Sequence, residues 1–137
     1  MRLPYYPDAA ILVLRLFLSS VLVYGVLDNI VSAERMLEFE QFLTQHRFPL
    51  PPLAARLSVY AQFACGLLLG LGLFTRPAAL VVAVNFLVAL GMVHWGLPFS
   101  QNVAPLAMLL GSVSVALSGP GRYSLAARLA AARPRVA

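Results

Sequence analysis

The feature that most constrains this chain is the length of its uncharged stretches. No Asp, Glu, Lys or Arg occurs in the 45 residues from Pro77 to Gly121, or in the 19 residues from Leu57 to Thr75. A helix needs about 20 mostly apolar residues to cross a bilayer, so the first stretch has room for two spans and the second for one. Gly, Pro and three polar residues interrupt the first stretch between 96 and 102. With a fourth apolar segment near the amino terminus, the predicted spans are 9–31, 57–74, 78–95 and 102–118.

The composition supports the same fold class. Of the 137 residues, 61% are hydrophobic and 11% are charged, whereas about a quarter of a soluble domain is charged. We therefore predict a single all-α membrane domain over 1–137, a bundle of four transmembrane helices. The first span carries Arg15 and lacks a small-x-small cleavage site, so it is expected to be retained rather than removed as a signal peptide. The expected location is the bacterial cytoplasmic (inner) membrane.

The arginines predict an orientation. Four spans place both termini on one side with six arginines, against three on the other side, where three glutamates offset them. The positive-inside rule then places both termini in the cytoplasm. Because these cations lie in short segments beside the membrane, they do not indicate binding of nucleic acid. The six are Arg2, Arg76, Arg122, Arg128, Arg133 and Arg135, and the three are Arg35, Arg47 and Arg56.

The segments that connect the spans differ in kind. Only 75–77 join the second and third spans, which makes these two an antiparallel hairpin. Between the first and second spans, Ser32 can cap an amphipathic helix over 33–46, which is expected to lie at the outer membrane interface or to cap the bundle. The cytoplasmic tail, 119–137, forms either a short basic helix over 124–133 or a solvated end. The apolar face of the 33–46 helix consists of Met36, Phe39, Phe42 and Leu43.

Five short motifs follow one another along the chain. They are Leu14-Arg15-Leu16, Phe48-Pro49-Leu50-Pro51, Gly72-Leu73-Phe74-Thr75-Arg76, Val93-His94-Trp95 and Gly119-Pro120-Gly121-Arg122-Tyr123-Ser124-Leu125. In order and spacing the chain resembles the DoxX family over nearly its whole length, and the last motif is the most specific. The resemblance implies a small four-helix protein of the bacterial inner membrane.

The resemblance also implies partners. The related DoxD subunit belongs to a thiosulfate:quinone oxidoreductase, and other members are linked to membrane-bound redox or oxidative-stress complexes. A quinone is therefore the candidate cofactor, and a soluble redox enzyme is the candidate partner. Many relatives carry a Glu where this chain has Gln62, and a His-Gly-x-x-Lys-like stretch where it has Tyr24-Gly25-Val26-Leu27-Asp28. A catalytic role that needs that Glu does not carry over to this chain.

Ionisable side chains inside the spans are costly and are therefore candidates for function. Arg15 lies about 9 Å of helix rise beyond the start of the first span. It contributes to a ligand site, extends to the cytoplasmic headgroups, or hydrogen-bonds the carboxyl end of the fourth span. Asp28 lies roughly 20 Å further along the same helix, so the two side chains cannot pair.

Asp28 and His94 are expected at the same depth, near the outer ends of the first and third spans. Tyr24 lies one turn before Asp28 on the same helix face. An Asp–His pair beside a Tyr can move a proton or hold a quinone carbonyl. The alternative is that Asp28 and His94 are hydrated at the interface, where Tyr60 and Trp95 belong to the aromatic belt.

Gln62 and Asn85 fall near mid-depth, as do several serines. Such groups either join neighbouring helices through hydrogen bonds or line a ligand site. Gly66 and Gly70 permit close helix packing, inside the bundle or between the protomers of a homo-oligomer. The candidate ligand-binding residues are thus Arg15, Tyr24, Asp28, Gln62, Asn85 and His94.

The sequence also argues against several kinds of chemistry. Cys65 is the only cysteine, so the chain has no internal disulfide or thiol pair. Two histidines, one of them in a loop, do not suffice for a bis-histidine haem or a multi-histidine site, and no metal is expected. The resemblance to the DoxX family implies the preferred function, a membrane subunit that is not an enzyme as an isolated chain, interacts with quinone or lipid and anchors a soluble partner in a redox or oxidative-stress complex. A small-molecule transporter or permeability factor and a structural assembly factor are the alternatives.

Overall fold

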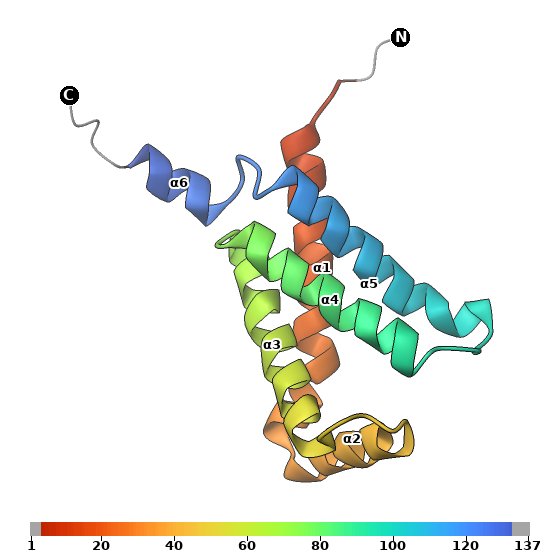
Figure 1. Cartoon of the computed structure of the whole chain (residues 1–137). Helices are drawn as coiled ribbons and strands as arrows, with labels where there is room; N and C mark the ends of the chain where they lie inside the picture. The colour runs from red at the N-terminus through yellow and green to blue at the C-terminus, as the bar shows by residue number, and fades with distance from the viewer. Residues whose placement is uncertain (1–3, 133–137) are drawn as a thin grey trace.

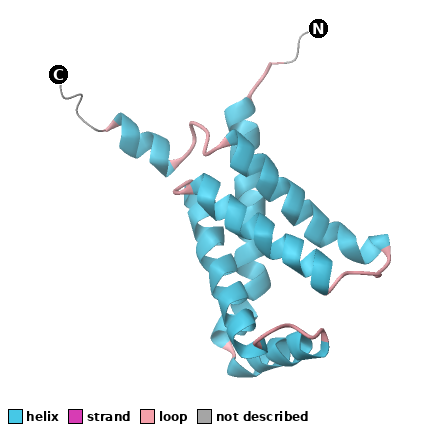
Figure 2. Ribbon diagram, viewed as in Figure 1, coloured by secondary structure: helices cyan, strands magenta, loops and turns pink. Residues whose placement is uncertain are grey.

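The computed structural model describes residues 4–132, which form six α-helices and no β-strand (Figure 1 and Figure 2). Four of them, α1, α3, α4 and α5, are long and apolar enough to cross a membrane. The predicted all-helical class, with four membrane spans and an additional helix between the first and second, is thereby confirmed. The helices are α1 (Pro7–Val31), α2 (Ala33–Gln45), α3 (Pro51–Leu71), α4 (Thr75–Met92), α5 (Phe99–Ser118) and α6 (Leu125–Ala131).

The hairpin between α3 and α4 lies earlier in the chain than predicted. Pro51 and Pro52 occupy the first turn of α3, where the missing proline N–H breaks no helical hydrogen bond, so α3 begins six residues before 57. Gly72 ends α3 because it adopts a left-handed conformation, with φ of +72°, and its N–H bonds to carbonyls of the last helical turn. The connection is therefore 72–74, and residues 75–77 form the first turn of α4.

At the opposite end of the bundle, α4 ends at Met92 and leaves Val93-His94-Trp95 beyond the helix. Helix α5 begins at Phe99, three residues before the predicted start. From the sequence, its polar first turn is expected to belong to the connection. These side chains are compatible with a helix because they lie at the exposed end of α5, where Asn102 Nδ2 donates a hydrogen bond to the Leu97 carbonyl.

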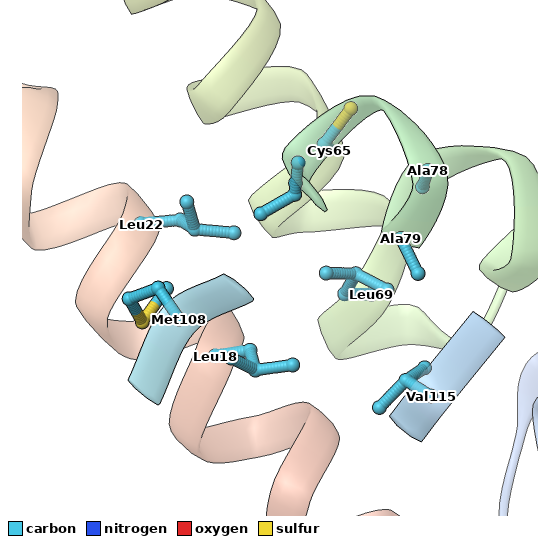
Figure 3. Close-up of a cluster of buried hydrophobic side chains, with 9 residues drawn as sticks. Leu18, Leu22, Cys65, Leu69, Ala78, Ala79, Met108 and Val115 are labelled. Atoms are coloured by element: carbon cyan, nitrogen blue, oxygen red, sulfur yellow. The ribbon is translucent and has the colours of Figure 1, made fainter. Parts of the chain in front are cut away.

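Close packing of α1 against α3 and of α4 against α5 forms the bundle, and α3 joins the two pairs. The central core brings side chains from all four spans together (Figure 3). Leu18 and Leu69, from α1 and α3, are completely buried in it. The remaining members are Leu22, Cys65, Ala78, Ala79, Val82, Met108 and Val115.

Helix α2 lies across the end of the bundle, beside the C-terminal end of α1 and the start of α3 (Figure 1). Ser32 Oγ caps it by accepting a hydrogen bond from the Arg35 backbone N–H. An ion pair of 3.0 Å between Arg56 and Glu40 joins α2 to α3. The apolar face of α2 forms a second core with α1 and α3, whose buried members are Val26, Met36, Leu43, Ala55 and Val59. The helix therefore caps the bundle, one of its two predicted placements.

Helix α6 lies at the other end and extends away from the bundle (Figure 1). Ser124 Oγ caps it by accepting a hydrogen bond from the Ala127 N–H. The segment predicted as either a short helix or a solvated end is thus helical over 125–131. Of the arginines counted for the orientation, Arg2, Arg133 and Arg135 lie outside the described residues.

Two glycines of α3 allow α1 to approach closely. A Cβ atom at Gly66 would lie 3.0 Å from Val23 Cγ2 and 3.1 Å from Leu22 Cβ, and one at Gly70 would lie 2.6 Å from Ser19 Oγ. Both glycines therefore face α1 of the same chain. The two positions differ, because a serine hydroxyl can rotate away, whereas a Cβ atom moves only with its helix.

We predict that Gly66→Ala destabilises the bundle, because α1 must move away from α3 to admit the methyl group. The expected loss is about 1–2 kcal/mol, at the lower end of the range for overpacked cores. Gly91→Ala is the matched control, since a Cβ at Gly91 meets nothing within 4 Å. Thermal unfolding in detergent should show a lower midpoint for Gly66→Ala than for Gly91→Ala. Equal midpoints would show that α1 is not held at this distance.

Candidate functional site

A cavity of about 490 Å³ lies between α2, α3 and α4. Its volume falls within the range of roughly 300–1,000 Å³ that is typical of small-molecule sites. Its walls come from the N-terminal half of α3 and the C-terminal half of α4, so it occupies the half of the bundle nearest α2. In Figure 1, α4 diverges from α3 toward this end. Leu57 and Val88, on opposite walls, are exposed on the bundle surface, so the cavity opens sideways toward lipid.

Aromatic side chains line the cavity on the α2 side. Phe39 and Phe42 come from α2 and stack with ring centroids 6.3 Å apart, and Phe48 follows from the segment before α3. Since most of the other lining residues are aliphatic, the cavity suits an apolar molecule with a flat ring.

Three polar side chains interrupt this apolar surface and bond to one another. Ser58 Oγ donates to Asn85 Oδ1 at 2.9 Å, and Gln62 Nε2 donates to Ser58 Oγ at 3.0 Å. Ser58 and Gln62 lie one turn apart on α3, and Asn85 lies near the middle of α4. We call these residues the amide triad. The triad joins α3 to α4 through hydrogen bonds, one of the two interpretations of Gln62 and Asn85, and it also lines the cavity.

Each end of the amide triad has hydrogen-bonding capacity to spare. Asn85 Nδ2 carries two N–H groups, and Gln62 Oε1 is an acceptor; neither atom has a hydrogen-bond partner among the described residues. Unpaired amide groups beside lipid are costly, so a bound molecule that supplies partners gains free energy there. The triad thus provides a donor and an acceptor in apolar surroundings.

His94 lines the same cavity from beyond the end of α4. Its Nδ1 atom is buried and lacks a hydrogen-bond partner within the part of the chain that the structure describes. The neighbouring Trp95 points outward, with 83% of its surface exposed. Asn85 lies within α4 and His94 lies beyond its end, so the triad and His94 are at different depths, with His94 nearer the end of the bundle.

Among the residues that the structure describes, no Asp, Glu, Lys or Arg lines this cavity. A bound anion or cation would have no opposite charge beside it, and burying an uncompensated charge is expensive. The lining therefore favours a neutral headgroup. Among the described residues, no group of three or more His, Cys, Asp or Glu side chains is placed to hold a metal ion.

Arg15 lies outside the cavity, near the opposite end of the bundle. It is 1% exposed, and its guanidinium donates to four backbone carbonyls. Two of them belong to the last turn of α3, Leu69 (2.9 Å) and Gly70 (3.2 Å). The others are Pro120 and, at 3.2 Å, Tyr123, in the segment between α5 and α6. We call this arrangement the Arg15 clamp.

The Arg15 clamp can be compared with two of the interpretations of Arg15, extension to the cytoplasmic headgroups and a hydrogen bond to the carboxyl end of the fourth span. A side chain with 1% exposure does not extend to the headgroups. Its hydrogen bonds reach Pro120 and Tyr123 in the segment just beyond α5, rather than the carboxyl end of the fourth span that one interpretation named, and they also reach the carboxyl end of α3, for which the sequence gives no expectation. The carbonyls at the end of a helix carry partial negative charge and compensate the guanidinium.

The structure does not bring Asp28 and His94 together. Asp28 is exposed near the end of α1, and Tyr24 has 84% of its surface exposed. Helix α1 packs mainly on α3, and α4 packs mainly on α5, so the ends of α1 and α4 are not neighbours in spite of their equal depth. The six candidates thus divide into three at the cavity (Gln62, Asn85, His94), one in the clamp (Arg15) and two on the surface (Tyr24, Asp28).

Ser58 and the three phenylalanines were not among the residues predicted for the site. The spacing held a signal for Ser58, because it precedes Gln62 by four residues and must share its helix face. Phe39 and Phe42 are predicted on the apolar face of the 33–46 helix, but their place in the cavity lining depends on where that helix lies over the bundle.

Comparison with known proteins agrees with this architecture. The DoxX family model matches residues 10–95, which is more than half of the chain and includes all or nearly all of α1, α2, α3 and α4. The motif 119–125, which is the most specific part of the resemblance, lies outside the match. No match was found among the curated proteins or the solved structures. This four-span membrane protein belongs to the DoxX family.

Proposed function

We propose that the cavity between α2, α3 and α4 binds a neutral, lipid-soluble molecule with a ring headgroup, a quinone. The observation that carries this proposal is the amide triad, the main polar feature inside an apolar cavity that opens toward lipid. A quinone carbonyl can accept a hydrogen bond from Asn85 Nδ2 while its ring packs beside Phe39 or Phe42. Its apolar tail can leave through the lateral opening.

The absence of charged residues from the cavity lining separates this proposal from a phospholipid site. Phosphate groups are bound by Arg, Lys or clustered backbone N–H groups. A neutral lipid remains compatible with the lining, and the experiment below distinguishes it from a quinone.

The broader role that we propose is a membrane subunit of a redox or oxidative-stress complex, located in the bacterial inner membrane, that anchors a soluble partner. The resemblance to the DoxX family supports this role, and the cavity supplies a place for the lipid-soluble reactant. A transporter is less well supported, since it needs a continuous polar path through the spans, and Arg15, Ser19, Asn85 and Asp28 would have to form that path. Arg15 bonds to carbonyls, and Asp28 is exposed away from Asn85.

The first test measures protection against thermal unfolding in detergent. A decyl benzoquinone should raise the unfolding midpoint of the purified protein, since a ligand at a hundred times its Kd contributes about 2.7 kcal/mol. Asn85→Leu and His94→Ala should each lose about 1–2 kcal/mol of this protection. Asp28→Asn is the control that should retain it, because Asp28 lies outside the cavity lining. No shift with benzoquinone or naphthoquinone would reject quinone binding, and protection by a neutral alkyl lipid alone would favour a lipid site.

We also propose that α6 and both termini face the cytoplasm. The described arginines at that end, Arg76, Arg122 and Arg128, are exposed, whereas two of the three at the α2 end form ion pairs with glutamates. The cytoplasmic end thus keeps the larger excess of positive charge. A C-terminal fusion to alkaline phosphatase, which is active only outside the cytoplasm, should be inactive, and a fusion to a fluorescent protein should fluoresce. The reverse pattern would invert the orientation.

A further inference from the structure

The two hydrogen bonds of the amide triad form a chain with a direction. In this chain Gln62 donates to Ser58 and Ser58 donates to Asn85, and each of the three groups can serve as donor or acceptor. An amide exchanges its N–H₂ and C=O groups when it turns by half a revolution, and a hydroxyl hydrogen rotates freely. The direction of the chain is therefore reversible.

Reversal keeps both internal hydrogen bonds. In the reversed chain, Asn85 Nδ2 donates to Ser58 Oγ, and Ser58 Oγ donates to Gln62 Oε1. The heavy atoms keep their positions, because the nitrogen and oxygen of an amide are nearly equal in size. The two directions therefore differ little in internal free energy, and the hydrogen bonds made by a ligand decide between them.

The ends of the chain exchange roles on reversal. In the direction observed, Asn85 presents N–H groups to the cavity and Gln62 presents an acceptor oxygen; in the reversed direction, Asn85 presents the acceptor and Gln62 the N–H groups. A quinone carbonyl can only accept, whereas a quinol hydroxyl must also donate if its proton is to be paired in apolar surroundings. Each oxidation state therefore matches one direction at a given end.

We propose that the amide triad reverses to match the oxidation state of its ligand, so that one position binds quinone and quinol with similar affinity. This inference rests on the proposed quinone site and concerns how that site recognises its ligand. The reversal moves no net charge and uses no titratable group, since serine and the two amides stay neutral. A subunit of this kind holds both forms for exchange with a redox partner without favouring either.

The test compares the dissociation constants of a decyl benzoquinone and of its quinol, held reduced under anaerobic conditions, for the full-length protein in detergent. The wild type should bind the two forms within about threefold of each other. Asn85→Leu should weaken both forms, by about five- to thirtyfold, the equivalent of one hydrogen bond at the position that the two forms share. Gln41→Leu replaces an exposed amide of α2 that does not line the cavity, and it should change neither constant.

A chain of fixed direction gives a different pattern. Asn85→Leu would then weaken only the quinone; such a selective loss, or a wild type that prefers one form more than tenfold, overturns the reversal and leaves the quinone site standing. Binding of neither form by the wild type rejects the quinone site itself. If the leucine variant does not fold, Asn85→Ala removes the same polar groups.

Discussion

Replacing Arg15 with methionine should lower the free energy of unfolding by about 3–5 kcal/mol, the range observed when one partner of a buried charged interaction is removed. Arg15 is 1% exposed and donates to four carbonyls from two segments that lie more than 45 residues apart in the chain. Methionine fills a similar volume but donates nothing. The carbonyls of Leu69, Gly70, Pro120 and Tyr123 would lose these donors, and each buried group left unpaired costs about 1–3 kcal/mol.

Lysine should not restore the clamp. The guanidinium is a planar fork whose three nitrogens reach acceptors on different sides, whereas the lysine ammonium is a single point with three donors. The bonds here use Nε, Nη1 and Nη2, so one ammonium cannot occupy all three places. We expect Arg15→Lys to recover less than half of the loss.

The measurement is unfolding in detergent, with Arg35→Met as the matched control. Arg35 is exposed and pairs with Glu38 on the surface of α2, so its replacement should cost no more than about 1 kcal/mol. If Arg15→Met unfolds with the wild-type midpoint, the clamp adds nothing to stability. The charge of Arg15 would then have to be explained by function.

Depth in the membrane could be predicted from the sequence, because a helix rises by a constant amount per residue. Counting placed Gln62 and Asn85 at the same level, and the structure brings them to the two ends of one hydrogen-bonded chain. The same counting placed Asp28 and His94 at one level, yet they are apart. The rotation and neighbours of each helix are set by packing, such as the close contact of Gly66 and Gly70 with α1. The depth of a residue in the membrane does not reveal this packing.

The remaining differences come from backbone groups. The uncharged stretches determine the number of spans. Gly72 ends α3 because it adopts a left-handed φ, and α3 begins at Pro51, whose missing N–H breaks no helical hydrogen bond there. The sequence identified Arg15 as costly to bury and did not reveal all its partners, since these are carbonyls rather than side chains. A backbone carbonyl occurs at every residue and gives no sequence signal.

Gly72→Ala should destabilise the protein by about 2–5 kcal/mol. A left-handed conformation costs an L-residue roughly 1–2 kcal/mol, and overpacking adds about 1–3 kcal/mol. The overpacking arises because a Cβ at Gly72 would lie 2.5 Å from Arg15 Nη2 and 2.5 Å from Ser124 Cβ. Gly72 thus sits where the end of α3, the Arg15 clamp and the start of α6 meet.

Gly96→Ala separates the two contributions to that loss. Gly96 has a similar φ of +82°, but nothing lies within 4 Å of its Cβ position, so its alanine variant should show only the conformational part. The difference between the two variants measures how tightly Arg15 and Ser124 enclose the turn.

Combining Gly72→Ala with Arg15→Met should cost less than the sum of the single losses, because methionine lacks the Nη2 atom that meets the new methyl group. Equal losses at Gly72 and Gly96 would mean that the guanidinium moves aside freely and that the clamp does not hold the turn.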